Sequence, residues 1–277
     1  MISDITIGQY YAGHSVLHRL DPRIKLILTL FFMVVIFMSR NFLSLGLIAL
    51  GSIALAVLSR VPAKTLLRSF RPILVLVLFT SILNLLYTQK EDAHILLAVP
   101  IFRWMLTITR EGVFAAIFTT ARIMSLILVS SLLTYTTTPS MLTTGLERLL
   151  KPLNKLHVPV SIFAMMMTLA LRFVPTLIEE VDRIMNAQKA RGSDLETGNF
   201  LKRAKAFVPV LVPLFISAFR RAAELANAME SRCYTGNNQR TSLKQLKIRP
   251  RDMLACALCA MLCAGVVILN GRFAKII

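Results

Sequence analysis

The chain alternates between long apolar runs and short basic segments, a pattern that predicts a helical membrane protein. A helix needs roughly 20 apolar residues to cross the hydrocarbon core, and spans as short as ~17 are tolerated. Five stretches reach or approach this length, namely Leu26–Met38, Phe42–Leu58, Pro72–Tyr87, Val113–Tyr135 and Met253–Leu269. We therefore expect an all-α integral membrane protein with about five transmembrane helices.

Two shorter apolar stretches, Val160–Leu171 and Phe207–Phe219, run directly into charged sequence. Their length favours buried or interfacial helices over membrane crossings, although counting both as spans, for seven in total, stays open. The surrounding segment predicts three helices, two of them long, with one proline expected to kink the first long helix and two expected to bend or break the second. These are Pro139–Leu150, Pro159 to Ala190 with Pro175 inside it, and Phe200 to about Ser231 with Pro209 and Pro213 inside it.

The distribution of charge predicts the orientation and three parts. The 277 residues are 56% hydrophobic and carry a net charge of +18, but the basic residues flank apolar runs, unlike those of a nucleic-acid-binding protein. Residues 136–251 contain 18 Lys and Arg against 8 Asp and Glu, so we expect them and the N-terminus to be cytoplasmic. The predicted parts are transmembrane helices in 1–135, a cytoplasmic module in 136–251 and a last transmembrane helix in 252–277.

The sequence offers little chemistry of its own. It contains no Gly-x-x-x-x-Gly-Lys-Ser/Thr loop, no His-Glu-x-x-His zinc motif and no Gly-x-Ser-x-Gly nucleophile motif. Cys256, Cys259 and Cys263 share one helix face, but without other ligands nearby they are expected to be packing residues rather than a metal site. We therefore expect no catalysis, cofactor or metal in this chain.

Arg122 is unusual because it lies in the middle of the fourth predicted span, where a charge is expensive. One interpretation is structural, with Arg122 facing the helix bundle and bonding backbone carbonyls or Asn84. The other is a role in gating or in contact with a membrane partner. The sequence leaves both open.

Two segments, Asn186–Gly192 and Asn227–Cys233, share the pattern Asn-Ala-x-x-small-Arg-small and close the two long predicted helices. A cation near a helix C-terminus gains typically ~0.3–1 kcal/mol from the helix dipole, but lysine would serve equally well. The planar fork of arginine suits a carboxylate in a partner's groove. We therefore predict a docking site made of Ala190, Arg191, Gly192, Ser231, Arg232 and Cys233.

Five segments together resemble the T component of energy-coupling factor (ECF) transporters, the EcfT family. They are Gly13–Lys25 (GHSVLHRLDPRIK), Leu171–Leu177 (LRFVPTL), Met185–Gly192 (MNAQKARG), Ala204–Leu214 (AKAFVPVLVPL) and Ala228–Tyr234 (AMESRCY). The resemblance covers nearly the whole chain. It implies a cell-membrane subunit that couples ATP binding and hydrolysis to vitamin uptake.

In that family two long cytoplasmic helices cross, and each ends in an x-Arg-x motif that docks on one of two ATPases, EcfA and EcfA′, which bind ATP and Mg. Cys233 departs from the usual Gly or Ala after the arginine. The resemblance also implies interchangeable substrate-binding S components. Their expected contact residues are Met165, Met166, Leu169, Leu211, Leu214 and Phe215.

Two alternative functions agree less well with the sequence. A conventional ABC permease subunit usually presents a single coupling motif, which disagrees with the paired motifs in one chain. An intramembrane lipid-modifying enzyme would need convergent His, Asp or Glu residues near the interface, which the sequence lacks.

Overall fold

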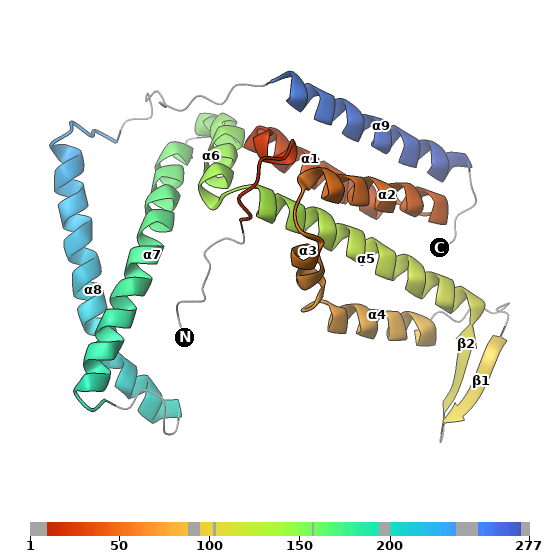
Figure 1. The fold of residues 1–277 in the computed structure, drawn as a ribbon, viewed down its shortest axis with the longest axis horizontal. Coiled ribbons are helices and arrows are strands. Elements are labelled where there is room, and N and C mark those ends of the chain that lie inside the picture. Colours follow the sequence, from red (N-terminus) through yellow and green to blue (C-terminus); the bar gives the residue numbers. More distant parts are fainter. Residues whose placement is uncertain are drawn as a thin grey trace. The chain divides into compact units, whose positions relative to one another are not determined.

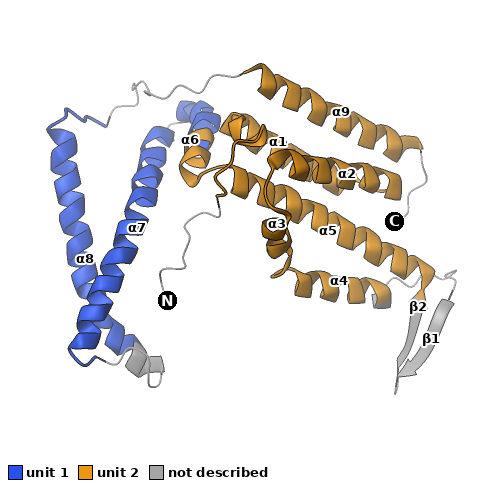
Figure 2. Ribbon diagram, viewed as in Figure 1, with its two compact units in different colours: residues 1–7, 146–245 blue, residues 8–145, 246–277 orange. Residues whose placement is uncertain are grey.

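The computed structural model describes residues 10–87, 95–101, 104–156, 158–193, 200–236 and 249–272. Within these ranges the chain forms nine α-helices, two short 3₁₀ helices and one two-stranded hairpin. It divides into two compact units, coloured separately in Figure 2. Unit 1 comprises residues 1–7 and 146–245, and unit 2 comprises residues 8–145 and 246–277. The three-part division expected from the sequence stays a prediction.

Unit 2 is built around four helices (Figure 1), which are α1 (Pro22–Met38), α2 (Phe42–Ser59), α5 (Arg110–Thr136) and α9 (Pro250–Arg272). Helix α5 contacts α1 and α2, and α9 packs against the same two helices. A short 3₁₀ helix, η1 (Leu17–Arg19), precedes α1. The C-terminal helix therefore completes a bundle that begins at the N-terminus.

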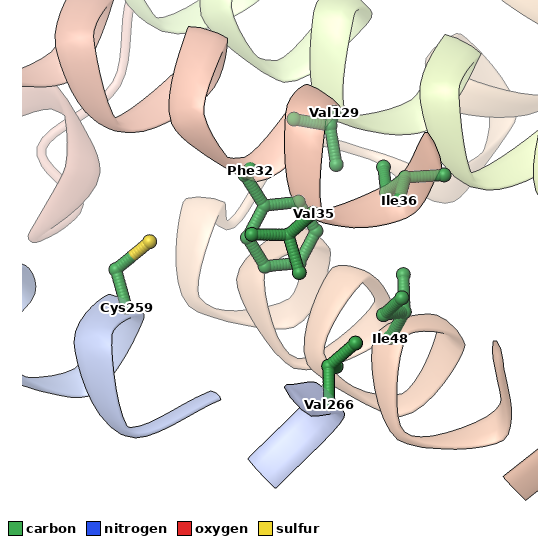
Figure 3. Packing of buried hydrophobic residues seen from close by; sticks show 7 residues of the cluster. All are labelled: Phe32, Val35, Ile36, Ile48, Val129, Cys259 and Val266. Atoms are coloured by element: carbon green, nitrogen blue, oxygen red, sulfur yellow. The ribbon is translucent and has the colours of Figure 1, made fainter. Parts of the chain in front are cut away.

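The core of the bundle is a cluster of seven buried residues from these four helices (Figure 3). Its members are Phe32, Val35, Ile36, Ile48, Val129, Cys259 and Val266. The thiol of Cys259 thus belongs to the apolar packing between α9 and α1. The other cysteines on α9, Cys256 and Cys263, are exposed and half-buried respectively.

The connection between α2 and α5 contains more structure than the sequence predicted. The basic stretch after α2 forms helix α3 (Ala63–Phe70), which is followed by α4 (Leu74–Tyr87). The segment expected to be a loop contains strands β1 (Ile95–Ile101) and β2 (Trp104–Thr109), which pair antiparallel. The all-α expectation therefore holds for the helices, while this hairpin is an exception, formed where Ile, Leu, Val and Thr favour extended backbone.

Unit 1 contains the two longest helices. Helix α6 (Pro139–Leu150) leads from unit 2 through the 3₁₀ helix η2 (Lys151–Leu156) to α7 (Val160–Ala190). Helix α8 (Phe200–Glu230) follows, and it crosses α7 in Figure 1. Both long helices have 31 residues. The prolines expected to bend them lie inside continuous helix, so α8 is not broken at Pro209 or Pro213.

Five described helices are long and apolar enough to cross a membrane, and a sixth span results if α3 and α4, bent by 55°, count as one. The five are α2, α5, α7, residues Ala204–Glu230 of α8, and α9. The number of candidate spans equals the five predicted from the sequence, but the helices that make up the set differ. Helices α7 and α8 are in this set, although the sequence favoured buried or interfacial helices there, whereas α1 and α4 are shorter, with 17 and 14 residues.

A buried polar cluster, here called the N-terminal anchor, holds the start of α1. It consists of Asp21, Lys25, Thr136, Thr137 and Asp252, all buried. The Lys25 ammonium donates to the Thr136 carbonyl (3.1 Å), the Thr136 hydroxyl (3.3 Å) and the Thr137 hydroxyl (2.9 Å). Lys25 has no acidic partner among the described residues, so these three oxygens offset its loss of hydration.

Asp252 provides the second half of the anchor. Its carboxylate accepts the Asp21 N–H at 3.0 Å and the Arg249 N–H at 2.8 Å. Gly145 of α6 also lies close to this region, since a Cβ added there would be 3.3 Å from the Pro22 carbonyl carbon. The anchor thus joins the start of α1 to the end of α5 and to the start of α9.

Replacing Asp252 tests the anchor. D252A leaves two backbone N–H groups without their acceptor, which we expect to cost ~2 kcal/mol and to lower the thermal unfolding midpoint in detergent by about 5 °C. D252N keeps one acceptor oxygen and should lose less. E111A, at an exposed acid of α5, is the control. Equal midpoints for D252A and E111A would show that the anchor does not stabilise the bundle.

Candidate partner-docking site

The two repeated segments adopt the same backbone geometry at the ends of α7 and α8. At the first, the Gly192 N–H donates to the Lys189 carbonyl and the Ser193 N–H to the Gln188 carbonyl, both at 3.0 Å. At the second, the Cys233 N–H donates to Glu230 (2.9 Å) and the Tyr234 N–H to Met229 (3.0 Å). Each set is the hydrogen-bond pair of a Schellman motif, which satisfies the last carbonyls of a helix.

The residue after each arginine has a left-handed backbone. Gly192 has φ +82° and Cys233 has φ +58°. Glycine adopts this conformation freely, whereas another L-residue incurs roughly 1–2 kcal/mol. No atom lies within 4 Å of a Cβ added at Gly192, so the demand there comes from the backbone alone. Glycine at position 192 therefore suits this helix ending, whereas Cys233 adopts the same backbone at a steric cost.

The six predicted docking residues are all exposed, including Arg191 and Arg232. Arg191 directly follows α7, and Arg232 lies two residues after the end of α8, so both are near the negative end of a helix dipole, which favours a positive charge. Their guanidinium groups are thus accessible and are held by a well-defined backbone turn. This arrangement is suited to binding a carboxylate of another protein.

An ion pair joins the two long helices at positions related by the same repeat. Glu180 of α7 pairs with Arg221 of α8, and the Ser217 hydroxyl donates to Glu180 at 3.3 Å. Glu180 and Arg221 are 41 residues apart, as are Arg191 and Arg232. The contact therefore lies the same number of turns before each arginine. At ~1.5 Å per residue, each helix extends about 16 Å from this contact to its arginine.

A second contact between the helices follows from a proline. Pro213 has no N–H, so the Pro209 carbonyl one turn earlier lacks its usual donor within α8. The side-chain amide of Gln188, in the first repeated segment, donates to this carbonyl at 3.5 Å. The proline thus creates an acceptor that α7 uses.

The residues predicted to contact an S component lie on strongly apolar helix surfaces. Met166, Leu211 and Phe215 are exposed, whereas Met165, Leu169 and Leu214 are half-buried. The exposed surface is wider than predicted and includes further large side chains on both helices. These are Phe163, Met167, Phe207, Val208, Val212, Ile216 and Phe219. Such contiguous apolar surface indicates contact with lipid or with another protein.

Arg122 contacts a backbone carbonyl and an aromatic ring within unit 2. Its guanidinium donates to the Ser39 carbonyl at 2.6 Å and lies 4.7 Å from the centre of the Phe118 ring. Among the described residues, Arg122 forms no hydrogen bond with Asn84. The backbone carbonyl of Asn84 instead lies near Gly112 of α5. The contact supports the interpretation in which Arg122 bonds a backbone carbonyl, here that of the turn between α1 and α2.

Sequence reasoning missed the N-terminal anchor and the pair Glu180–Arg221. Asp252 gave one usable signal, because it is an acid in the first turn of an otherwise apolar helix. Glu180 and Arg221 gave another, since they have opposite charge at equivalent positions of the repeat. The sequence also predicts a turn that contains Asp194 and Glu196 and a polar linker from Thr235 to Arg251; the two turn residues and most of the linker lie outside the described residues.

Comparison with known proteins gives consistent results. Residues 13–243 match the model of the family CbiQ, cobalt transport protein. A protein of Clostridium kluyveri named energy-coupling factor transporter transmembrane protein EcfT is 47% identical over 271 residues, 98% of each chain. Proteins with the same name from Ruminiclostridium cellulolyticum and Bacillus subtilis are 46% and 43% identical. The alignment with the Ruminiclostridium protein covers 99% of this chain and 100% of that protein. The alignment with the Bacillus protein covers 91% of this chain and 93% of that protein.

The two helix ends should respond oppositely to substitution. G192A places a side chain on a left-handed backbone and should weaken the end of α7 by ~1 kcal/mol, whereas C233G should strengthen that of α8 by up to the same amount. Hydrogen exchange of the Ser193 amide should therefore become about fivefold faster in G192A. Exchange of the Tyr234 amide should become slower in C233G, by up to about fivefold. Unchanged exchange at both amides would contradict the assigned geometry.

Proposed function

The chain belongs to the EcfT family, the transmembrane proteins of energy-coupling factor transporters, and on that premise we propose that it connects two partner ATPases to a separate substrate-binding subunit. It is a multi-pass membrane protein and a non-catalytic transporter subunit. This membership sets aside the lipid-modifying enzyme and the conventional permease. ATP and Mg would be bound by the ATPases and not by this chain.

The observation that carries this proposal is the pair of equivalent helix ends. Two exposed arginines follow two helices of equal length and sit on matching backbone turns. A single docking site on one partner would require only one such end. Two suggest two related binding grooves, and we assign Arg191 to one ATPase and Arg232 to the other.

The contact between α7 and α8 would convert ATPase closure into movement. If each helix end is held by a different ATPase, bringing the ATPases together must change the angle between the helices. The pair Glu180–Arg221 lies where the helices touch, at equal distance along each from its arginine. We propose that it acts as the pivot of two levers of equal length.

The exposed apolar faces of α7 and α8 would carry the S component. Positively charged segments place the N-terminus and unit 1 on the cytoplasmic side in this proposal. Both helices would then lie along the membrane under the S component, with Met166, Leu211 and Phe215 among the contacts. We propose a vitamin as the transported substrate, as the resemblance to the EcfT family implies.

The N-terminal anchor would hold the membrane bundle while the levers move. Two of the three chain connections between the units run through α6 and through the segment before α9. The anchor residues Thr137 and Asp252 lie next to these two connections in the chain. Movement of unit 1 would therefore pull on fixed points of the bundle and not on its individual helices.

Removing both arginines should abolish ATPase docking. Truncating a charged group that is paired in an interface costs ~2–5 kcal/mol, so R191A/R232A should reduce co-purification of the ATPases more than about 30-fold and stop vitamin uptake. Membrane insertion should persist. R183A/R220A removes two other exposed cations of the same helices and is the matched control. Normal ATPase binding and uptake by R191A/R232A would refute the docking assignment.

Exchanging the charges of the pivot tests the lever proposal. E180R and R221E each place like charges together, at a cost of ~1 kcal/mol for a partly exposed pair, and should slow uptake about fivefold. The double variant E180R/R221E restores opposite charges and should recover most of the uptake while all three variants bind the ATPases. If the double variant is as slow as the single variants, the ion pair is not the pivot.

A further inference from the structure

A partly open cavity of ≈ 170 Å³ lies in unit 2 and is lined by residues of η1, α1, α2, α5 and α9. Its walls are mainly apolar, with contributions from Leu28, Phe32, Leu55, Leu132, Leu258 and Leu262. An engineered cavity of ~150 Å³ with such a lining stays free of water and binds benzene. Because protein interiors are otherwise closely packed, this space is suited to a flexible chain of methylene groups.

The cavity is reached from the apolar side of the bundle. Leu254 and Leu258 of α9 line it, yet their side chains are 65% and 51% exposed. In a membrane protein, the apolar surface of such a helix faces lipid or a membrane partner. The bilayer therefore supplies a suitable occupant directly at the opening.

The same cavity has a positively charged end. The buried Lys25 and the exposed Arg251 both line it, together with Thr136. Among the described residues, the Lys25 ammonium donates only to neutral oxygens. The two acids of the anchor, Asp21 and Asp252, are buried, and the Asp252 carboxylate accepts backbone N–H groups, so the exposed cation at the rim is Arg251. A guanidinium at the rim suits a phosphate, to which it can donate two parallel hydrogen bonds.

We propose that this cavity holds part of one acyl chain of an anionic membrane phospholipid, with the rest of the lipid in the bilayer and the phosphate of its headgroup bound by Arg251 near Lys25. The apolar lining of the cavity favours an acyl chain, and the two cations at one end favour a negatively charged headgroup. The lipid would fill the space between α9 and the other bundle helices, beside the N-terminal anchor. This site is independent of the docking of Arg191 and Arg232.

The test uses the full-length chain in its transporter complex, reconstituted in bilayers of equal parts phosphatidylglycerol and phosphatidylethanolamine. After extraction with mild detergent and washing, mass spectrometry measures the lipid retained per chain. A255F directs a ring at the cavity, whereas A257F makes the same change at an exposed position of α9 that does not line it. We expect about one phosphatidylglycerol per chain with wild type and A257F, and several-fold less with A255F.

R251Q separates the headgroup from the chain without altering the packing. Loss of a charge-assisted contact should lower the preference for phosphatidylglycerol over phosphatidylethanolamine about tenfold while total retained lipid changes little. R272Q, at the other end of α9, should leave the preference unchanged. Equal retention by A255F and A257F, recovery of free fatty acid only, or an unaltered preference in R251Q would overturn the proposal.

Discussion

The ammonium group of Lys25 lies inside the bundle of unit 2 and is held by three oxygens of Thr136 and Thr137. A buried charge without such acceptors would be very costly, so the start of α1 and the end of α5 are held together. Asp252 adds the start of α9 through two backbone N–H groups. The anchor therefore lies at one end of the bundle, next in the chain to the two connections to unit 1 that run through α6 and before α9.

In unit 1 the repeated sequence motif corresponds to two long helices with matching ends and an ion pair between them. Both helices end in the same hydrogen-bonded turn, and the charged pair that joins them occupies equivalent positions. Symmetry of this kind lets two similar partners act on one chain with equal leverage. The difference between Gly192 and Cys233 shows that the two ends are not identical, because only glycine adopts the left-handed backbone without strain.

The sequence predicted the features that depend on local pattern. The apolar runs correspond to α2, α5 and α9, and the repeated motif corresponds to two matching helix ends. It did not predict the partners of Lys25 and Arg122, because Thr136 and Ser39 are 111 and 83 residues away in the chain. Helix α3 was missed because its basic residues read as a loop, and the hairpin because charges flank its strands.

Site-specific photo-cross-linking in the assembled transporter tests the central claim most directly. A photoreactive amino acid at Ala190 or Ser231, each next to its arginine, would react with whatever lies against that helix end. The account predicts that Ala190 cross-links to one ATPase and Ser231 to the other, with no such product from Arg183 or Arg220. Cross-linking of neither position to an ATPase, or of both to the same one, would contradict it.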